Sequence, residues 1–281
     1  MKDIKILAVE SSCDETAVAV VENGNKILSS VVATQIDVHK DFGGVIPEVA
    51  SRIHVENISM VIEEALKKAE LDMPDIDAVA FTQGPGLVGC LHIGVQAAKT
   101  LAWAFDKPLV PVHHIAGHIY ANRFLTDLAF PLLALVVSGG HTELVYMKDE
   151  WSFQILGTTQ DDAIGEAGDK VGRVLGLPYP GGVYVDKLAK EGKPIYTLSK
   201  PKTEQALDFS FSGLKSSVLQ FIDRQKRQGL EFNAADLAAS YQETALDALL
   251  LRARKALTQY QPKQMLLAGG VAANSRLREK I

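Results

Sequence analysis

The sequence predicts an α/β protein built from two similar lobes, and three observations support this prediction. A strand, a polar turn and a second strand occupy residues 4–21, and the same order returns over residues 132–147. Helices with one apolar face separate further strands. Glycine-rich turns follow several strands, where backbone N–H groups can donate to anions. We therefore expect one domain over residues 1–130, a second over residues 131–281, and a nucleotide cleft between them.

Composition limits the class of protein. Of the 281 residues, 47% are hydrophobic and 22% are charged, which is ordinary for a soluble globular protein. Two cysteines, Cys13 and Cys90, are too few for a disulfide framework, and no apolar run is as long as a membrane span. We expect a cytoplasmic protein with no membrane partner. The net charge of -5 argues against nucleic-acid binding by long-range attraction, so a polyanionic partner would need a local basic patch.

Strands and helices alternate in the first half of the chain. Asn23-Gly24 is a strong signal for a hairpin between two strands. Residues 47–70 place apolar side chains at helical spacing with charged side chains opposite them. The expected elements are strands 4–9, 16–21, 26–32, 76–82 and 108–112, and helices 47–70 and 87–105.

The second half repeats the opening unit and adds two glycine-rich turns. Residues 133–147 align with the opening strands at a period of roughly 126 to 128 residues, too long for a solenoid. Gly181-Gly182 follows a segment rich in carboxylates, and Gly269-Gly270 separates a strand from a helix that begins near Asn274. Such turns let a ligand approach the backbone closely, which suits a nucleotide, although glycine also serves any tight connection.

His114 and His118 are one helical turn apart if a helix begins at His114. Their β-carbons would then be roughly 5 to 6 Å apart, so that both imidazoles could bind one metal ion. Histidines at this spacing also occur as ordinary hydrogen-bonded residues. The spacing alone leaves both interpretations open.

A series of motifs resembles the tRNA adenosine threonylcarbamoyltransferase family, whose members were once described as O-sialoglycoprotein endopeptidases. The resemblance extends from about Ile4 to Ser275, nearly the whole chain. In addition to His114 and His118, the motifs are residues 10–16 (ESSCDET), 42–48 (FGGVIPE), 84–86 (GPG), 137–142 (VSGGHT), 161–170 (DDAIGEAGDK), 179–182 (YPGG), 208–215 (DFSFSGLK) and 269–274 (GGVAAN).

The resemblance implies a fold, an activity and partners. The fold would be two ribonuclease-H-like lobes of the actin, Hsp70 and sugar-kinase superfold, with a nucleotide cleft between the lobes. The activity would be that of an acyltransferase, which moves a threonylcarbamoyl group from threonylcarbamoyl-adenylate to the N6 amine of the adenosine beside the anticodon, in tRNAs reading ANN codons. The partners would be tRNA, a related degenerate subunit and a small ATPase subunit.

The resemblance also implies roles for individual residues. His114 and His118 would bind one divalent metal ion, iron in preference to zinc. Asp14 and Glu15 would lie near the reacting end of the donor, and the sequence leaves open whether either is a general base. The implied donor-binding residues are Val137, Ser138, Gly139, Gly140, His141, Asp169, Gly182, Asp186 and Asn274.

Two departures from the family pattern affect these expectations. Gly168 stands where the family usually has an aromatic residue, beside Asp169. Family members also continue past residue 281 and supply an aspartate as a further metal ligand. We therefore expect this chain to hold its metal weakly, unless another residue such as Glu15 or His141 completes the site.

Other classes of function were weighed against this one. A zincin-type metalloprotease needs a glutamate directly after the first histidine, where this chain has Ile115. A small-molecule kinase of the same superfold and a non-catalytic nucleotide-binding partner subunit remain as alternatives. Two basic clusters are candidates for contacts with phosphates, or else ordinary solvated faces: Arg224, Lys226 and Arg227, and Arg252, Arg254 and Lys255.

Overall fold

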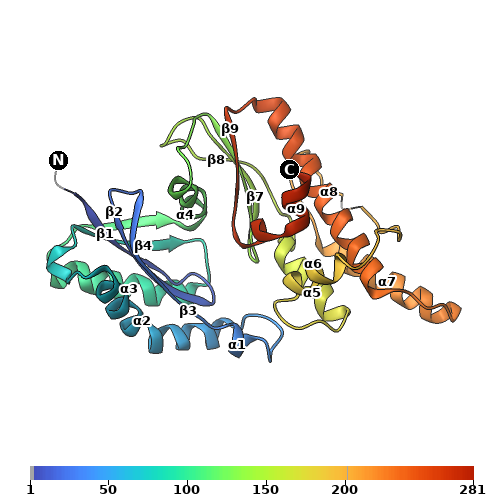
Figure 1. The fold of residues 1–281 in the computed structure, drawn as a ribbon, viewed down its shortest axis with the longest axis horizontal. Coiled ribbons are helices and arrows are strands. Elements are labelled where there is room, and N and C mark those ends of the chain that lie inside the picture. The colour runs from blue at the N-terminus through green and yellow to red at the C-terminus, as the bar shows by residue number, and fades with distance from the viewer. Residues whose placement is uncertain (1–2, 201) are drawn as a thin grey trace. The chain divides into compact units, whose positions relative to one another are not determined.

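The structure is a computed structural model that describes residues 3–200 and 202–281. It divides into two compact units, Met1–Asp127 and Leu128–Ile281. Each unit contains one β-sheet with helices packed against it (Figure 1). The predicted α/β class is therefore confirmed.

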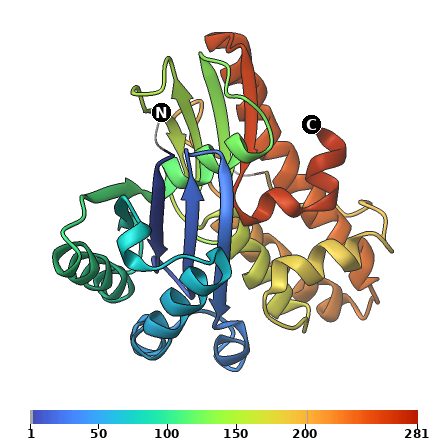
Figure 2. The ribbon, with the colours of Figure 1, turned by 60° about the vertical axis from the view of Figure 1, so that its left-hand side comes forward.

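The first unit contains a five-stranded sheet in the order β3-β2-β1-β4-β5. Strand β1 is antiparallel to β2 and parallel to β4, and β4 is parallel to β5. Figure 2 shows the first three strands side by side in dark blue. The strands are β1 (Lys5–Glu10), β2 (Glu15–Glu22), β3 (Lys26–Thr34), β4 (Ala78–Gly84) and β5 (Leu109–His113).

The hairpin between β2 and β3 turns at the predicted dipeptide. Asn23 and Gly24 both have positive φ, 54° and 71°. A hairpin turn with this backbone matches the right-handed twist of the flanking strands, and asparagine and glycine adopt it at the least cost. The turn therefore sets the pairing of Glu22 with Lys26, and the predicted hairpin is confirmed.

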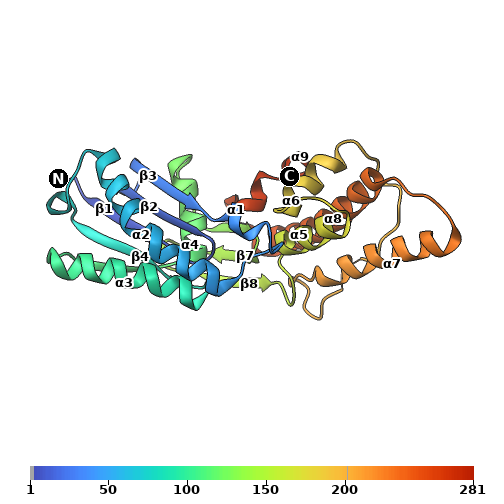
Figure 3. The ribbon, with the colours of Figure 1, turned by 90° about the horizontal axis from the view of Figure 1, so that it is seen from below.

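Two long helices pack against this sheet. Helix α2 (Pro47–Ala69) begins with a proline in its first turn, where the missing N–H has no helical partner to lose, and ends at Glu70 in the left-handed region. Helix α3 (Val88–Ala104) connects the parallel strands β4 and β5, and Figure 3 shows it alongside α2. The shared core includes Leu7, Val9, Val18, Val20, Ile58, Val61, Ile62, Ile76, Val79, Phe81 and Ala98.

Short helices complete the first unit. Helix α1 (Ile36–His39) precedes α2, and α4 (His114–Tyr120) directly follows β5. The 3-10 turns η1 (Met73–Asp75) and η2 (Ala121–Phe124) lead into β4 and out of α4. A helix does begin at His114, which is the condition on which His114 and His118 lie one helical turn apart.

The second unit repeats the sheet pattern of the first. Its four strands have the order β8-β7-β6-β9, in which β6 is antiparallel to β7 and parallel to β9, as β1 is to β2 and β4. All six residues of β6 are buried, as expected for a central strand with both faces covered. The strands are β6 (Leu132–Val137), β7 (Thr142–Met147), β8 (Gln154–Thr158) and β9 (Gln264–Ala268).

The helices of the second unit enclose most of its core. The longest, α8, is capped by Asn233, whose side chain accepts hydrogen bonds from the N–H groups of Ala235 and Asp236. The sequence analysis did not predict α8, α6 or α7. The helices are α5 (Ile164–Val174), α6 (Gly181–Ala189), α7 (Ser212–Gln228), α8 (Ala234–Tyr260) and α9 (Ser275–Lys280), with a 3-10 turn η3 (Gly270–Ala273) before α9.

The structure removes Arg252 from one of the two basic clusters, whose other members Arg254 and Lys255 are exposed. Arg252 is buried, with 7% of its surface exposed, and its guanidinium donates to the carbonyl oxygens of Asp208 and Ala248 and to the hydroxyl of Thr203. It therefore joins α8 to the segment before α7 and is not a surface phosphate contact. None of the helices within the described ranges is long and apolar enough to cross a membrane.

Candidate functional site

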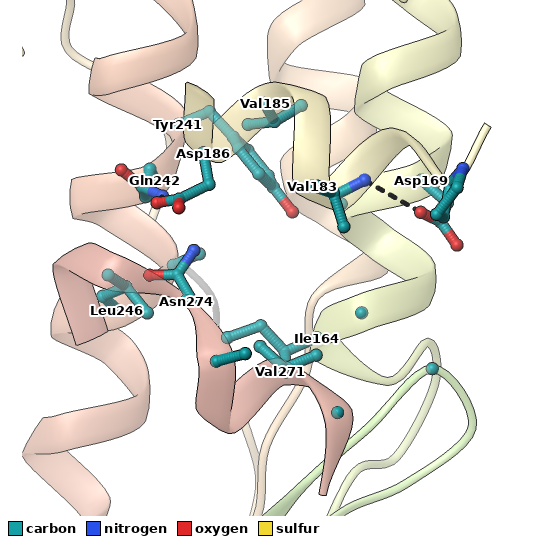
Figure 4. Close-up of a pocket in the computed structure, with 18 residues that line it drawn as sticks. Ile164, Asp169, Val183, Val185, Asp186, Tyr241, Gln242, Leu246, Val271 and Asn274 are labelled. Atoms are coloured by element: carbon teal, nitrogen blue, oxygen red, sulfur yellow. Dashed lines mark hydrogen bonds between the residues drawn. The ribbon is translucent and has the colours of Figure 1, made fainter. Parts of the chain in front are cut away.

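A cavity of about 360 Å³ lies within the second unit (Figure 4). Pockets that hold small ligands begin at roughly 300 Å³, so the volume suits a molecule of nucleotide size. Its walls come from α5, α6, α8 and the turn η3. Five of the predicted donor-binding residues line it, namely Gly139, Asp169, Gly182, Asp186 and Asn274.

Four predicted donor-binding residues stand outside the lining of this cavity. One of them ends β6 and the other three lie in the turn that follows: Val137, and then Ser138, Gly140 and His141. That turn is closed by a hydrogen bond of 2.8 Å from the Ser138 N–H to the His141 carbonyl. The Ser138 carbonyl in turn accepts from the Gly165 N–H at 3.3 Å, so the turn lies against the start of α5.

The two cavity aspartates are held by hydrogen bonds from neighbouring elements. Asp169 on α5 accepts from the Gly182 N–H on α6 at 2.8 Å, as Figure 4 shows by a dashed line. Asp186 on α6 accepts from the Gln242 side chain on α8 at 2.7 Å, and from the Ser275 hydroxyl at 3.0 and 3.1 Å. Each carboxylate therefore fixes the position of one wall relative to another.

Glycine permits the close approach of α5 and α6 beside the cavity. A β-carbon on Gly172 of α5 would lie 2.6 Å from the α-carbon of Gly181 on α6. A β-carbon on Gly168, the residue that departs from the family pattern, would lie 3.2 Å from the α-carbon of Gly182. The contact is backbone against backbone, and it places the first turn of α6 at the cavity wall.

The turn after β9 also depends on glycine. Gly269 has a φ of 90°, and a β-carbon there would lie 2.3 Å from the Val137 carbonyl oxygen. The chain then enters η3 and reaches Asn274, whose side chain accepts from the Leu277 N–H at 2.8 Å and so starts α9. The predicted break at Gly269-Gly270 thus places Gly270 and Asn274 in the cavity wall.

Helix α8 contributes to the cavity, which the sequence patterns did not predict. Tyr241, Gln242, Ala245 and Leu246 all line it, at the helical spacing that one face of α8 would present. Tyr241 is nearly buried, and burial, followed by the charges of Asp169 and Asp162, raises the pKa of its phenol. The missed signal was the Asn233 cap followed by apolar residues at helical spacing.

A second group of polar residues lies at the carboxyl ends of β1, β4 and β5 in the first unit. These strands are parallel neighbours, so residues at their ends meet at one edge of the sheet. Glu10 ends β1, Thr82 lies near the end of β4, and His114 follows β5. The Glu10 carboxylate accepts from the Thr82 hydroxyl at 2.6 Å and lies 3.1 Å from His114 Nδ1.

Glu10 is held in its charged form. Burial alone would raise its pKa, but hydrogen bonds from His114, Ser12 and Thr82 outweigh burial and lower the pKa to about 2. Because an ionised carboxylate only accepts hydrogen bonds, Nδ1 of His114 carries a hydrogen. Glu10 therefore sets the tautomer of His114, and sequence reasoning did not identify this role.

His114 and His118 lie together on α4, as predicted. Their ring centroids are 4.5 Å apart with an edge-to-face arrangement. Metal-binding histidines commonly donate their second ring N–H to a carboxylate, as His114 does to Glu10. Within the described ranges, no group of three or more His, Cys, Asp or Glu residues could hold a metal. The pair fits a divalent ion as two of the three protein ligands that open sites commonly take.

Of the two residues predicted near the reacting end, Asp14 lies in the turn between β1 and β2, and Glu15 is the first residue of β2. Asp14 is half-buried and Glu15 is exposed at its surface. Partial loss of solvent around its carboxylate, followed by the charges of Asp14 and Glu10, raises the pKa of Glu15. The neighbouring Cys13 has a pKa raised to about 12, chiefly by burial, so its thiol is a poor nucleophile near neutral pH.

Comparison with solved structures supports the predicted superfold. HypF of T. kodakarensis matches 98% of this chain and 43% of its own with a TM-score of 0.67 at 15% identity. Component A of the (R)-2-hydroxyglutaryl-CoA dehydratase of Acidaminococcus fermentans matches 99% of this chain and 87% of its own with a TM-score of 0.56 at 14% identity. Both have the ATPase fold shared by actin, Hsp70 and sugar kinases, so the predicted superfold is confirmed.

Comparison with sequences is more specific. The family model TsaD, tRNA N6-adenosine threonylcarbamoyltransferase, matches residues 26–281. The protein of that name from Bacillus anthracis is 59% identical over all 281 residues, which span 82% of its length. The one from Listeria monocytogenes serovar 1/2a is 60% identical over the same span. The resemblance read from the motifs is thereby confirmed, and the chain belongs to the tRNA N6-adenosine threonylcarbamoyltransferase family.

Proposed function

We propose that this chain transfers a threonylcarbamoyl group from threonylcarbamoyl-adenylate to N6 of the adenosine beside the anticodon, in tRNAs reading ANN codons. The observation that supports this most directly is the identity of 59 to 60% over the full chain with relatives named for this transfer. The cavity lined by five of the implied donor-binding residues is consistent with it.

The transfer exchanges one bond for another. The N6 amine attacks the carbonyl carbon of the carbamoyl-phosphate anhydride, and an N–C bond forms. The bond between that carbon and the bridging oxygen breaks, and the oxygen stays on phosphorus. AMP leaves with the electron pair of that bond, and the amine gives up a proton. The donor is already activated, so the protein chiefly has to position the two reactants and stabilise the departing phosphate.

The cavity of the second unit would hold the adenylate. The backbone at Gly139, Gly182 and Gly270 would let its phosphate or ribose approach closely, because no side chain stands in the way. Asn274 offers a neutral amide at the same wall. Asp169 and Asp186 would keep these walls in place through their bonds to Gly182 and Gln242.

In the first unit, His114 and His118 would bind one divalent ion, iron in preference to zinc. Such an ion would supply a Lewis acid that can polarise an oxygen atom. With Nδ1 of His114 directed to Glu10, Nε2 would be its ligating atom. Glu15, whose pKa is raised, is a better proton acceptor than an ordinary carboxylate, which suits the loss of the N6 proton.

Partners and location extend the proposal. The chain would act in the cytoplasm, where its tRNA is found, together with a related degenerate subunit and a small ATPase subunit. The support is family membership.

The test is transfer to unmodified tRNA with donor and partner subunits supplied. Nucleosides from the digested tRNA are analysed by mass spectrometry, and we expect threonylcarbamoyladenosine only in tRNAs that read ANN codons. Asp186→Ala, which removes the acceptor for Gln242 and Ser275, should lower donor binding. A chain that binds threonylcarbamoyl-adenylate without transferring it would be a partner subunit, and phosphorylation of a small metabolite by ATP would instead identify a kinase.

A further inference from the structure

The turn between β1 and β2, which carries Asp14 and leads into Glu15, is backed by four buried polar side chains. Thr16, Gln35, His39 and His54 each have at most 2% of their surface exposed. Buried polar groups weaken a fold unless they are hydrogen-bonded, and a fully paired network instead fixes one arrangement. The bonds of these four side chains converge on the turn and on the start of α2.

His54, on α2, holds the turn from both ends. Its Nε2 lies 2.9 Å from the Cys13 carbonyl oxygen, and its Nδ1 lies 2.7 Å from the Thr16 hydroxyl. A carbonyl only accepts, so Nε2 carries the hydrogen and Nδ1 accepts from Thr16. The ring therefore bridges Cys13 and Thr16, and Asp14 and Glu15 are the two residues between them.

Gln35 and His39 fix the turn from the other side. The Gln35 N–H donates to the Asp14 carbonyl at 3.1 Å. The Gln35 side chain donates to the Ala50 carbonyl of α2 at 3.3 Å and accepts from Nε2 of His39 at 3.1 Å. Nδ1 of His39 in turn accepts from the Ile46 N–H at 3.4 Å. Two successive carbonyls of the turn are therefore anchored to the same helix.

We propose that His54 is a positioning residue, which through Thr16 and the Cys13 carbonyl sets the orientation of Asp14 and Glu15. This inference rests on the proposed function, because it takes those carboxylates to act in the transfer. The arrangement serves this role since its buried side fixes the backbone and its outer side leaves Asp14 half-buried and Glu15 exposed.

The test compares changes that break the His54 contact with one that weakens the same helix elsewhere. Thr16→Val keeps the shape of the side chain and removes the hydroxyl, and His54→Gln removes the ring. A misplacement of about 1 Å at a reacting group lowers rates by roughly 100-fold. We expect kcat to fall about 10- to 100-fold in both variants, with KM values for tRNA and donor changed by less than about threefold.

Two further variants distinguish positioning from general destabilisation. Thr16→Ser restores the hydroxyl and should restore kcat. Ile58→Ala, one helical turn beyond His54 in the core, should lower the thermal midpoint without lowering kcat. In the wild type, ¹⁵N spectra of the ring should show the Nε2–H tautomer of His54, and Thr16→Val should change them.

The outcomes separate this inference from the proposed function. If Thr16→Val and His54→Gln lower kcat no more than Ile58→Ala does at equal loss of stability, the network is merely structural and the inference is wrong. If Asp14→Asn and Glu15→Gln leave kcat unchanged, the assignment of the turn to the reacting end fails instead. A loss in the turn variants that Thr16→Ser does not restore also overturns the inference.

Discussion

Replacing Gly172 by alanine tests whether the backbone contact between α5 and α6 shapes the cavity of the second unit. The new β-carbon would lie 2.6 Å from the Gly181 α-carbon and 3.0 Å from the Gly181 carbonyl carbon. Carbon atoms in contact prefer roughly 3.5 to 4.0 Å, so the first turn of α6 must move by about 1 Å. That turn carries Gly182, which bonds Asp169 at the cavity wall.

The size of the effect follows from two opposing contributions. Overpacking of this kind costs about 1 to 3 kcal/mol, while alanine favours a helix interior over glycine by up to about 1 kcal/mol. A backbone-against-backbone overlap belongs at the upper end of the overpacking cost, about 2 to 3 kcal/mol. With about 1 kcal/mol regained in helix propensity, the net loss is about 1 to 2 kcal/mol, which lowers the thermal midpoint by about 2 to 8 °C in a unit of this size. Displacement of Gly182 should weaken AMP binding by about tenfold.

The assays are thermal unfolding and calorimetric titration with AMP, the product released in the proposed reaction. Gly213→Ala is the matched control, because Gly213 is also helical and a β-carbon there meets nothing within 4 Å. The control should bind AMP as the wild type does and lose no stability. Gly172→Ala with the midpoint and AMP affinity of the wild type would refute the idea that this contact shapes the cavity.

Two further predictions concern the first unit. Glu10→Gln should weaken metal binding by about 10- to 100-fold, measured by chelator competition. The double variant His114→Ala, His118→Ala should bind no metal. Unchanged metal affinity in Glu10→Gln would contradict the pairing of Glu10 with His114. Burial lowers the pKa of His54 below the ordinary 6.5, and the charge of His39 lowers it slightly further. The hydrogen bond to the Cys13 carbonyl and the charges of Asp14 and Glu10 raise the pKa but do not outweigh burial. The unfolded chain therefore binds more protons below pH 6.5, so the free energy of unfolding should fall as pH drops through this value. Urea unfolding should show a shallower fall in His54→Gln, and an equal slope in both proteins would rule out His54 as its source.

Local patterns were enough to predict much of the fold. The Asn23-Gly24 hairpin, the start of α4 at His114 and the repeated strand, turn and strand unit all depend on neighbours in sequence. The Gly269-Gly270 break was predictable for the same reason, since the signal is the glycine itself.

The missed features depend on contacts between distant segments. Tyr241 enters the cavity only because α8 packs against α6, and Glu10 sets the tautomer of His114 across a separation of 104 residues. Arg252 looked like part of a basic surface because charge in a sequence does not reveal burial. His54 belonged to none of the sequence motifs, and its two hydrogen bonds form only once α2 lies against the turn.

The placement of Glu10, Thr82 and His114 at the ends of three neighbouring strands has a consequence for how the protein matures. Their contacts require β1, β4 and β5 to be paired in register, and β5 is made last of the three. A slip of one residue between β1 and β4 would turn Thr82 to the opposite face of the sheet and away from Glu10. A chain in which β5 has not yet joined the sheet cannot form the Glu10–His114 contact, so complete assembly of this sheet is a precondition for fixing the ring of His114.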